Sequence, residues 1–543
     1  MNAFLKILEQ LISAVSPECW LKQRFYPFDG RDEHTLEVFD ACVFHQDADG
    51  ALGIAWLKSG QHAELMTFPF RIARYSRDGD LITLPPWSLR EATTDALFYS
   101  TWKQAVASVG QISTMRGGVL LCKQFEAHSS FNIINLWTDN KNASTRVETQ
   151  HLCKIFRVLD PAQPHSVEAD ILEYLNSQNH FLYHPELTTR YDFVAANSEL
   201  CLPVAIVTRY IQSNAKLWQD FTAKIQHARY PEPMRERSSH AAWLSLIETS
   251  GRLGRMLAEF HIAMAQSRDN ALINPVSNTG AAREKWSEVM LHKLNERAYL
   301  TRKYAAQLQE NDDSLTELPQ FAHDLFNRVV AADHLGLLVR IHGHAHLGQV
   351  LSAEEHLYLV NYETDSLDDE EYRLQKQSCL KDLTATILSM QYAWLTTERN
   401  EDLPVFGDIL GADSEFTKHI IKNLKKSSTP VRYTPAFKDL QDALTRSYLQ
   451  SLSENPANLE LLPEKVQDLE NLFALCLLMR VLKETVRDFR NHNPRYKIDL
   501  QILAGLMNSQ KPKGQFGHIS HLLNRSAQPT EDFANYGVDS DFS

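Results

Sequence analysis

Three features that would assign this chain to a class are missing from its sequence. No stretch approaches the ~18 uninterrupted apolar residues that a membrane-spanning helix needs, so we expect no membrane partner. Positive charge is not in excess, because 55 Lys and Arg stand against 68 Asp and Glu and give a formal net charge of −13. An acidic chain repels nucleic acid unless it gathers a local basic patch, so we expect no nucleic-acid partner. Internal repeats and low-complexity segments are absent as well.

Cysteine pairs that would mark a metal or redox motif are also missing. The seven cysteines are scattered, odd in number, and none forms a CxxC pair, which is typical of reduced thiols in a cytosolic protein. Residues 1–20 do not read as a signal peptide, because charged residues interrupt an apolar pattern that recurs at helical spacing. We therefore expect an amphipathic helix there and a cytoplasmic location.

What is present is an ordinary globular composition over 543 residues, 43% hydrophobic and 23% charged. This composition excludes collagen-like and wholly disordered chains, and a prior of ~150 residues per domain suggests two to four domains. Residues 1–130 combine the first helix with strand-like runs. Two of these runs, 36–44 and 53–57, flank a DADG sequence at 47–50 that predicts a hairpin turn.

The rest of the chain divides by its pattern. Residues 131–215 follow the order strand, polar loop, strand, helix, strand, which predicts a small sheet lobe whose helix has Ser166 as its N-cap. Residues 216–510 are mostly helical in pattern, with two short β-like runs between 337 and 365. The last segment, 511–543, is polar and predicts a loosely held tail.

Four elements in this order carry the chemistry. Lys154 lies on a predicted strand, Glu168 on the next helix, a His-Gly loop follows at 342–351, and a later strand ends at Asn361-Tyr362-Glu363. A protein-kinase-like fold handles ATP in this order: a strand Lys grips the phosphates and pairs with a helix Glu, a loop carboxylate accepts the hydroxyl proton, and a downstream carboxylate holds Mg²⁺.

Specific segments resemble the bacterial maltokinases, relatives of the aminoglycoside phosphotransferases. IHGHAHLGQVL at 341–351 resembles their catalytic loop, and WLKQRFYPFDGR at 20–31 is similar to their N-terminal cap signature. LCKIFRVLDPAQPHSVEADIL at 152–172 resembles their Lys strand and following helix, and GRLGRMLAEFHIAMA at 251–265 resembles a further family helix. KETVRDFRNHNP at 483–494 is a looser match, and the likeness extends to about residue 508.

The resemblance implies an α+β, protein-kinase-like bilobal fold with an N-terminal cap at 1–130, a small nucleotide-binding lobe at 131–215, a large helical C-terminal lobe at 216–510 and a flexible tail at 511–543. It implies ATP and Mg²⁺ as cofactors if the chain is active, and a sugar ligand. Trehalose synthase and other α-glucan enzymes become candidate partners, because maltokinases are often fused to trehalose synthase or work beside it.

The resemblance also assigns roles to individual residues. The predicted nucleotide-binding residues are Lys154 and Glu168, Asn142 and Ser144 in the phosphate-covering loop, and Arg209 and Tyr210 in the hinge. His342, His346 and Asp382 are predicted to support the catalytic loop, and Gln349, Asn361 and Glu363 to bind the metal. Lys483, Glu484 and Arg487 are predicted to lie on the acceptor side.

Departures from the family pattern include the catalytic positions, besides Ala345, the hinge residues Arg209 and Tyr210, and Lys483 and Arg487 on the acceptor side. His344 stands where the family has its catalytic Asp, and Asn361 stands where it has the metal-binding Asp. Mg²⁺ prefers carboxylate oxygens, so the metal site is weakened. Loss of acid–base assistance alone typically slows a reaction ~10²–10⁴-fold. The double loss predicts a pseudokinase with a regulatory or scaffolding role in trehalose, maltose or α-glucan metabolism.

Alternatives to the pseudokinase remain open. The chain is an active ATP-dependent kinase of maltose or a related sugar if His344 serves as a weak base, or if Asp365 or Asp368 supplies a displaced carboxylate. A transition-metal site is the third possibility, because His342, His344 and His346 share one face of an extended segment. Glu363 or Asp365 would then be the fourth ligand. The sequence names neither the acceptor nor the oligomeric state.

Overall fold

The computed structural model describes residues 3–23, 25–28, 35–60, 63–107, 110–125, 133–138, 142–147, 150–162, 164–178, 181–213, 215–229, 236–308, 313–353, 356–362, 370–398 and 435–509. The chain forms two compact units. Unit 1 comprises Met1–Asn179 and His184–Gln212, and unit 2 comprises His180–Tyr183 and Ser213–Ser543. The predicted tail, Glu363, Asp365 and Asp368 lie outside the described residues.

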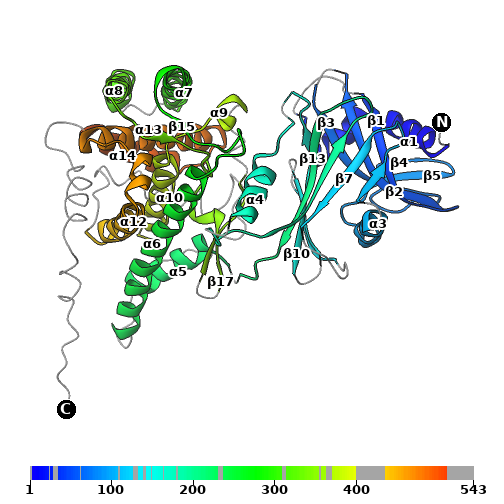
Figure 1. The fold of residues 1–543 in the computed structure, drawn as a ribbon, viewed down its shortest axis with the longest axis horizontal. Helices are drawn as coiled ribbons and strands as arrows, with labels where there is room; N and C mark the ends of the chain where they lie inside the picture. The colour runs from blue at the N-terminus through cyan, green and yellow to red at the C-terminus, as the bar shows by residue number, and fades with distance from the viewer. Residues whose placement is uncertain are drawn as a thin grey trace, which may run out of the picture. The chain divides into compact units, whose positions relative to one another are not determined.

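Unit 1 begins with an antiparallel sheet in the order β1-β2-β3-β5-β4, with β11 paired to β3 (Figure 1). Helix α1 packs one face into the same core, where Leu8, Leu11 and Ile12 are each 1% exposed. Burial of each such side chain contributes at most ~1.5–3 kcal/mol. The elements are α1 (Ala3–Ala14), α2 (Pro17–Leu21), β1 (Leu36–Gln46), β2 (Gly50–Ser59), β3 (Leu65–Ala73), β4 (Ile82–Leu84), β5 (Trp87–Glu91) and α3 (Ala96–Ala107).

The predicted DADG hairpin is confirmed between β1 and β2. These strands pair antiparallel, and Oδ1 of Asp47 accepts the backbone N–H groups of Asp49 at 2.8 Å and Gly50 at 2.9 Å. A Cβ at Gly50 would lie 2.1 Å from the carbonyl oxygen of Ile72. The close approach of β2 to β3 therefore requires glycine at this position.

A second antiparallel sheet in unit 1 has the order β6-β7-β12-β13-β10-β9-β8. It includes β6 and β7, which precede residue 130 in the sequence. Helix α4 starts where the sequence predicts, because Oγ of Ser166 accepts the backbone N–H of Ala169 at 3.2 Å. The elements are β6 (Gln111–Ser113), β7 (Val119–Gln124), β8 (Ile133–Thr138), β9 (Asn142–Val147), β10 (His151–Phe156), β11 (Val158–Leu159), α4 (Val167–Ser177), β12 (Leu187–Val194) and β13 (Cys201–Arg209).

Unit 2 is built mostly from helices, as the sequence predicts. Its described elements are β14 (Ala215–Lys216), α5 (Leu217–Arg229), α6 (Glu236–Ala265), β15 (Val276–Ser277), α7 (Gly280–Gln307), α8 (Asp313–Val330), β16 (Leu337–Leu338), η1 (Leu347–Gln349), β17 (Val350–Ala353), β18 (His356–Leu359), α9 (Glu370–Leu374), α10 (Leu380–Glu398), α12 (Pro435–Ser453), η2 (Pro456–Leu461), α13 (Val466–Arg490) and α14 (Tyr496–Ser509).

Helix α13 is the centre of unit 2. It contacts α7, α8, α10 and α14 (Figure 1), and its residues from Leu472 to Leu482 are all buried. Helices α6 and α12 pack so closely at Gly254 that a Cβ there would lie 2.1 Å from the carbonyl oxygen of Leu444. Glycine at this position therefore permits the contact. This packing holds α6, which supplies His261 to the site described below.

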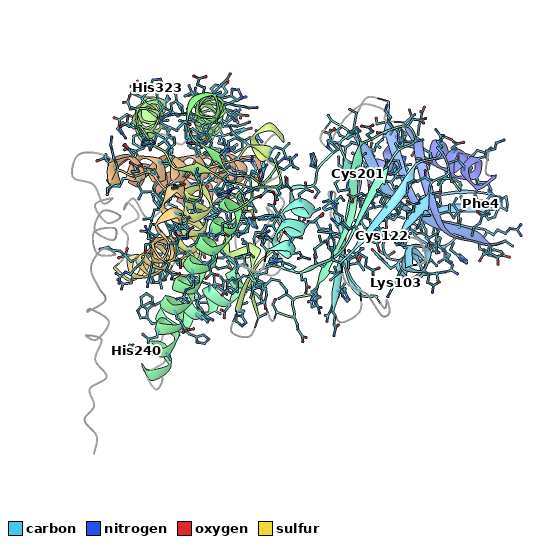
Figure 2. The ribbon with its side chains drawn as sticks, viewed as in Figure 1. Phe4, Lys103, Cys122, Cys201, His240 and His323 are labelled. Atoms are coloured by element: carbon cyan, nitrogen blue, oxygen red, sulfur yellow. The ribbon has the colours of Figure 1, made fainter. Side chains whose placement is uncertain are left out.

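All seven cysteines carry free thiols, as the sequence predicts. Cys122 lies on β7 and Cys201 at the start of β13, both in unit 1 (Figure 2). Burial raises the pKa of the Cys153 and Cys476 thiols to about 12, which keeps these groups protonated and unreactive at neutral pH. In the described part of the chain, no helix is both long and apolar enough to cross a membrane.

Candidate functional site

Unit 1 contains a buried ion pair at the predicted nucleotide position. Nζ of Lys154 on β10 donates to Oε2 of Glu168 on α4 at 2.6 Å, and the two residues are 7% and 5% exposed. Ser144 on β9 is the cross-strand partner of Lys154, so the structure places both on neighbouring strands. Asn142 begins β9 opposite Phe156. The pair fixes the direction of the Lys154 ammonium group, as expected for the Lys–Glu pair of a protein-kinase-like nucleotide site.

The predicted hinge residues lie where β13 ends. Nε of Arg209 donates to Oε2 of Glu186 at 2.5 Å, and both side chains are exposed. The guanidinium of Arg146 lies 4.0 Å from the ring centroid of Tyr210, a cation–π contact that joins the hinge to β9. Both residues are thus engaged within unit 1.

In unit 2, the His-Gly loop is held by a buried carboxylate. Asp382 at the start of α10 accepts the backbone N–H of His342 at 2.7 Å and of Gly343 at 2.9 Å. Nε2 of His261 lies 3.2 Å from its Oδ2. Burial opposes ionisation, but the contacts with His261 and His342 outweigh it and lower the pKa of Asp382. Asp382 therefore accepts two backbone hydrogen bonds from the loop, and its supporting role stays a prediction.

The histidines of the loop are not equivalent. His342 donates through Nε2 to the carbonyl of Val360 at 3.0 Å and accepts the N–H of His344 at Nδ1 at 3.2 Å. Burial lowers the pKa of His342 to about 4, and it lowers that of His346 well below the ordinary value. Nδ1 of His346 accepts the N–H of Gly348 at 3.0 Å. His342 and His346 are thus neutral and hold the backbone, while His344, the predicted catalytic residue, is half-buried.

The histidine rings do not form a metal cluster in the described residues. No group of three or more His, Cys, Asp or Glu side chains is arranged there to hold a metal ion. The Nδ1 atoms of His342 and His346 already accept backbone N–H groups. The rings of His344 and His346 pack edge to face, with 4.5 Å between their centroids. The proposed fourth ligands, Glu363 and Asp365, lie outside the described residues.

The structure brings together two of the predicted metal ligands. Nδ2 of Asn361 donates to Oε1 of Gln349 at 3.2 Å, and the backbone N–H of Val360 donates to the carbonyl of Gln349 at 3.0 Å. Asn361 has a φ of 67°, in the left-handed region that Asn and Asp tolerate better than other side chains. Two neutral amides therefore face each other, and Oε1 of Gln349, one of the oxygens predicted to bind Mg²⁺, accepts this hydrogen bond.

The predicted acceptor-side residues on α13 belong to a buried charge network. Glu484 is 2% exposed and pairs with Arg480 at 2.8 Å, with Arg495 at 3.1 Å and with Arg487. Burial opposes ionisation, but Arg480, Arg487 and Arg495 lower the pKa of Glu484 to about 2. Lys483 is also buried, at 6% exposed.

Sequence reasoning missed several members of this network. Arg480 lies four residues before Glu484 on the helix, a spacing that brings side chains together. That spacing could have revealed Arg480. Arg495 and the Tyr392–Asp499 hydrogen bond of 2.5 Å had no local signal, because they come from other segments. Oδ2 of Asp488 accepts from Nε of Arg495 at 2.5 Å, which joins α13 to the turn before α14.

We expect Asp382→Asn to destabilise the protein by about 1–3 kcal/mol. An amide offers one oxygen where the loop needs two acceptors, so a buried backbone N–H of His342 or Gly343 loses its partner. Urea unfolding measures the free energy of unfolding. The control is Asp269→Asn, at an exposed position, for which ~0.5 kcal/mol or less is expected. Equal, small losses in the two variants would contradict the supporting role of Asp382.

No protein-family model matches the chain. Its structure is similar to that of a glucosamine kinase, with a TM-score of 0.59 and 15% identity over 92% of this chain and 99% of that chain. The chain has a protein-kinase-like fold. A glucosamine kinase in complex with glucosamine, ADP and inorganic phosphate matches with a TM-score of 0.57 and 15% identity, over 91% of this chain and 97% of that chain.

An aminoglycoside 2'-phosphotransferase in complex with GDP matches with a TM-score of 0.36 and 11% identity, over 76% of this chain and 99% of that chain. The predicted α+β, kinase-like fold class is confirmed by the glucosamine kinase likeness. At 15% identity this likeness shows the fold alone.

Proposed function

We propose that this chain is a pseudokinase of the sugar-kinase type, which binds a nucleotide and a sugar but does not transfer phosphate. The observation that carries the proposal is the hydrogen bond from Asn361 to Gln349 at 3.2 Å. This bond pairs two neutral amides at the predicted metal position, where an active kinase of this fold would use an anionic oxygen for Mg²⁺.

The metal argument rests on charge. Phosphoryl transfer depends mainly on positioning and on neutralising the charge of the transferred group. Mg²⁺ usually keeps several waters and is bound through one or two carboxylates and the substrate phosphates. Asn361 contributes no charge, and its NH₂ group is directed at Gln349. Metal–ATP binding in a productive geometry is therefore weakened.

The base argument rests on His344. A general base has to lie within hydrogen-bond reach of the acceptor hydroxyl, and an imidazole does not place its nitrogen where a carboxylate places its oxygen. Two neighbouring histidines are neutral and hold the backbone, so neither replaces the missing Asp. Without the base and the metal carboxylate, the chain lacks both proton removal from the acceptor hydroxyl and charge stabilisation of the transferred phosphoryl group.

Binding of a nucleotide and binding of a sugar, by contrast, are each supported by an observation. The Lys154–Glu168 pair at 2.6 Å keeps the nucleotide-gripping arrangement, and a structurally similar glucosamine kinase is found with glucosamine, ADP and inorganic phosphate. We propose ATP as the nucleotide and an amino sugar, maltose or a related sugar as the second ligand. By its resemblance to maltokinases, the chain would act in the cytoplasm beside trehalose synthase or other α-glucan enzymes.

The second candidate function is a slow ATP-dependent sugar kinase. The intact Lys154–Glu168 pair favours it, since a strand Lys and a helix Glu retained as a buried pair serve the active form of the fold. His344 would then be a weak base, and Gln349 with Asn361 or Glu363 would bind Mg²⁺ or Mn²⁺.

A phosphoryl-transfer assay tests both functions on the full chain. ATP is supplied with Mg²⁺ or Mn²⁺ and with glucosamine, maltose, trehalose or glucose, and sugar phosphate is detected by mass spectrometry. The proposal expects no sugar phosphate above the background of a Lys154→Ala variant. Product that depends on Lys154 would overturn the pseudokinase and establish the slow kinase.

We expect Lys154→Ala to weaken ATP binding by about 10–100-fold, which corresponds to the loss of one charge-assisted hydrogen bond. Calorimetric titration of ATP measures the dissociation constant without requiring catalysis. The control is Lys58→Ala, at an exposed position on β2, with unchanged affinity. Equal affinity of wild type and Lys154→Ala would contradict nucleotide binding at this pair.

A further inference from the structure

Helix α14 carries a buried carboxyl group that no cation pairs with in the described part of the chain. Asp499 is 0% exposed, and its Oδ1 accepts the hydroxyl of Tyr392 on α10 at 2.5 Å. Its Oδ2 is shielded from solvent and has no hydrogen-bond partner among the described residues. Buried charged groups are normally paired with an opposite charge. A single hydroxyl partner therefore suits the neutral, protonated form of Asp499.

Arg495, in the turn before α14, does not supply the missing partner. Its Nε donates to Oδ2 of Asp488 at 2.5 Å, and its Nη2 donates to Oδ1 of Asp488 at 2.9 Å and to Oε2 of Glu484 at 3.1 Å. The same guanidinium lies 4.7 Å from the ring centroid of Tyr392. Two carboxylates on α13 therefore share this positive charge, and an ionised Asp499 would be a third anion beside them.

The groups that act most strongly on Asp499 come from three elements. They are Tyr392 of α10, Glu484 and Asp488 of α13, and Arg495 of the turn. Helix α8 also contacts α14. Those of its charged residues whose side chains are described are all exposed, and they are Glu317, His323, Asp324 and Arg328. Asp499 thus faces two carboxylates and one cation.

These surroundings favour the protonated form. Burial and the charge of Asp488 raise the pKa of Asp499 well above its ordinary value. Burial also raises the pKa of Asp488, but Arg495 opposes this effect, so Asp499 is the carboxyl that keeps the proton. Burial and the neighbouring Asp499 raise the pKa of Tyr392 well above its ordinary value, so its hydroxyl stays a donor. Lys497, the other charged residue of α14, is two positions away and does not face Asp499.

We propose that Asp499 is a proton-dependent latch, which holds α14 against α13 while it is protonated and loosens this contact when it ionises. Ionisation would place an unpaired charge in the core beside Asp488 and Glu484, and displacement of α14 into solvent relieves that repulsion. Glu484 also pairs with Arg480 and Arg487, so the latch is continuous with the predicted acceptor side on α13. The inference does not depend on nucleotide or sugar binding.

The pH dependence of the latch has a defined sign. An unfolded Asp titrates near ~3.9, whereas the folded Asp499 titrates at a higher pH. As pH rises above ~4, the unfolded chain releases this proton before the folded chain does, so folding becomes less favourable until the folded group also titrates. One such proton raises the unfolding equilibrium constant by up to about tenfold per pH unit. A carboxylate whose pKa is lowered by arginines gives the opposite direction.

Urea unfolding of the full chain between pH 5 and pH 7 tests the latch. The variant is Asp499→Asn, which cannot ionise and can still accept the hydrogen bond from Tyr392. We expect the unfolding constant of the wild type, divided by that of Asp499→Asn, to grow at least ~10-fold over this range. The control Asp269→Asn changes an exposed carboxylate of unit 2, and the corresponding ratio is expected to stay constant. A ratio for Asp499→Asn that is constant or falls as pH rises overturns the proposal.

Infrared absorption tests the proton without a need for the variant to fold. At pH 7 the wild type is expected to show the carbonyl band of a protonated carboxylic acid, and a folded Asp499→Asn is expected to lack it. Absence of the band from the wild type, or its persistence in folded Asp499→Asn, overturns the proposal. A hydrogen bond that served only packing would give no such band.

Hydrogen exchange tests whether the effect is local to α14. We expect the protection of α14 amides in the wild type to fall at least ~10-fold between pH 5 and pH 7, after correction for the intrinsic exchange rate, and to stay constant in Asp499→Asn. The same amides are expected to exchange faster than the global unfolding constant allows, because a latch opens before the whole chain unfolds. Exchange of α14 only at the global rate would make this helix part of the core and overturns the proposal.

Discussion

The double variant His344→Asp/Asn361→Asp is expected to transfer phosphate from ATP to a sugar at least ~10²-fold faster than the wild type. The lower bound comes from acid–base assistance alone, typically ~10²–10⁴-fold, and a restored metal carboxylate adds charge stabilisation. The readout is sugar phosphate formed per minute, with glucosamine and maltose as acceptors. Addition of Lys154→Ala to the double variant is expected to abolish the gain.

Each half of the double variant has its own signature. In Asn361→Asp, a carboxylate oxygen replaces the NH₂ group that now donates to Gln349 at 3.2 Å. Two oxygens then face each other, so we expect the variant to bind Mg²⁺ and to be stabilised by it against heat. His344→Asp alone restores a base without the metal ligand and is expected to gain less activity than the pair.

A matched control exists for the metal effect. Asn197 is also exposed and left-handed, with a φ of 57°, but lies in unit 1. Asn197→Asp makes the same chemical change on the same backbone conformation and is expected to show no Mg²⁺-dependent stabilisation. Equal responses of the two Asp variants to Mg²⁺, or no response of Asn361→Asp, would contradict a latent metal position beside Gln349.

Glu484→Gln is expected to lower the free energy of unfolding by about 3–5 kcal/mol at pH 7. Glu484 is 2% exposed and pairs with Arg480, Arg487 and Arg495. Removal of one partner from a buried ion pair leaves charge without compensation, and that is where losses of this size occur. Urea unfolding measures the effect. Glu288→Gln, at an exposed position of α7, should change stability by ~0.5 kcal/mol or less.

The effect of Glu484→Gln depends on pH in a defined direction. The three arginines lower the folded-state pKa of Glu484 to about 2, whereas an unfolded Glu titrates near ~4.3. A group with a depressed folded pKa stabilises the protein above its unfolded pKa, and this stabilisation is lost as pH falls through the folded value. The difference between wild type and Glu484→Gln should therefore be full at pH 7 and shrink between about pH 4 and pH 2. A difference that does not vary over this range would assign the effect to packing instead.

The parts of the molecule that sequence predicted are those with local signals. Ser166 caps α4 because a hydroxyl before a helix satisfies a free N–H, and the DADG turn follows from the same kind of local chemistry. The Lys154–Glu168 pair was predicted from the order of elements and lies together in the structure. The kinase-like fold was predicted from that order and from family resemblance, and the likeness to glucosamine kinase confirms it.

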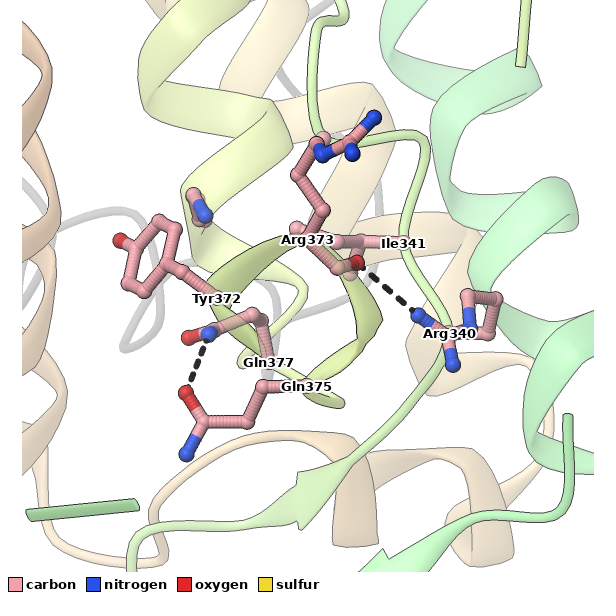
Figure 3. A pocket seen from close by; sticks show the side chains of 8 residues that line it. Arg340, Ile341, Tyr372, Arg373, Gln375 and Gln377 are labelled. Carbon is pink, nitrogen blue, oxygen red and sulfur yellow. Dashed lines mark hydrogen bonds between the residues drawn. The ribbon is translucent and has the colours of Figure 1, made fainter. Parts of the chain in front are cut away.

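The parts that sequence missed depend on contacts between distant segments. The strands β6 and β7 join the sheet of β10 through β12, and nothing in their own sequence specifies that neighbour. Arg495 reaches Glu484 only because the turn before α14 folds back on α13. Arg340, Arg373 and Lys381 likewise come together from three separate segments and line one small hollow (Figure 3).

The backbone conformation at Asn361 limits which residues position 361 can accept. At a φ of 67°, Asn, Asp and Gly are the side chains that fit without marked strain. An Asn codon differs from an Asp codon by one base at its first position, and the same holds for the His codon at position 344. Two single-base changes would therefore place a carboxylate at each of these two positions. The backbone conformation at position 361 would accept such an Asp as readily as it accepts the present Asn.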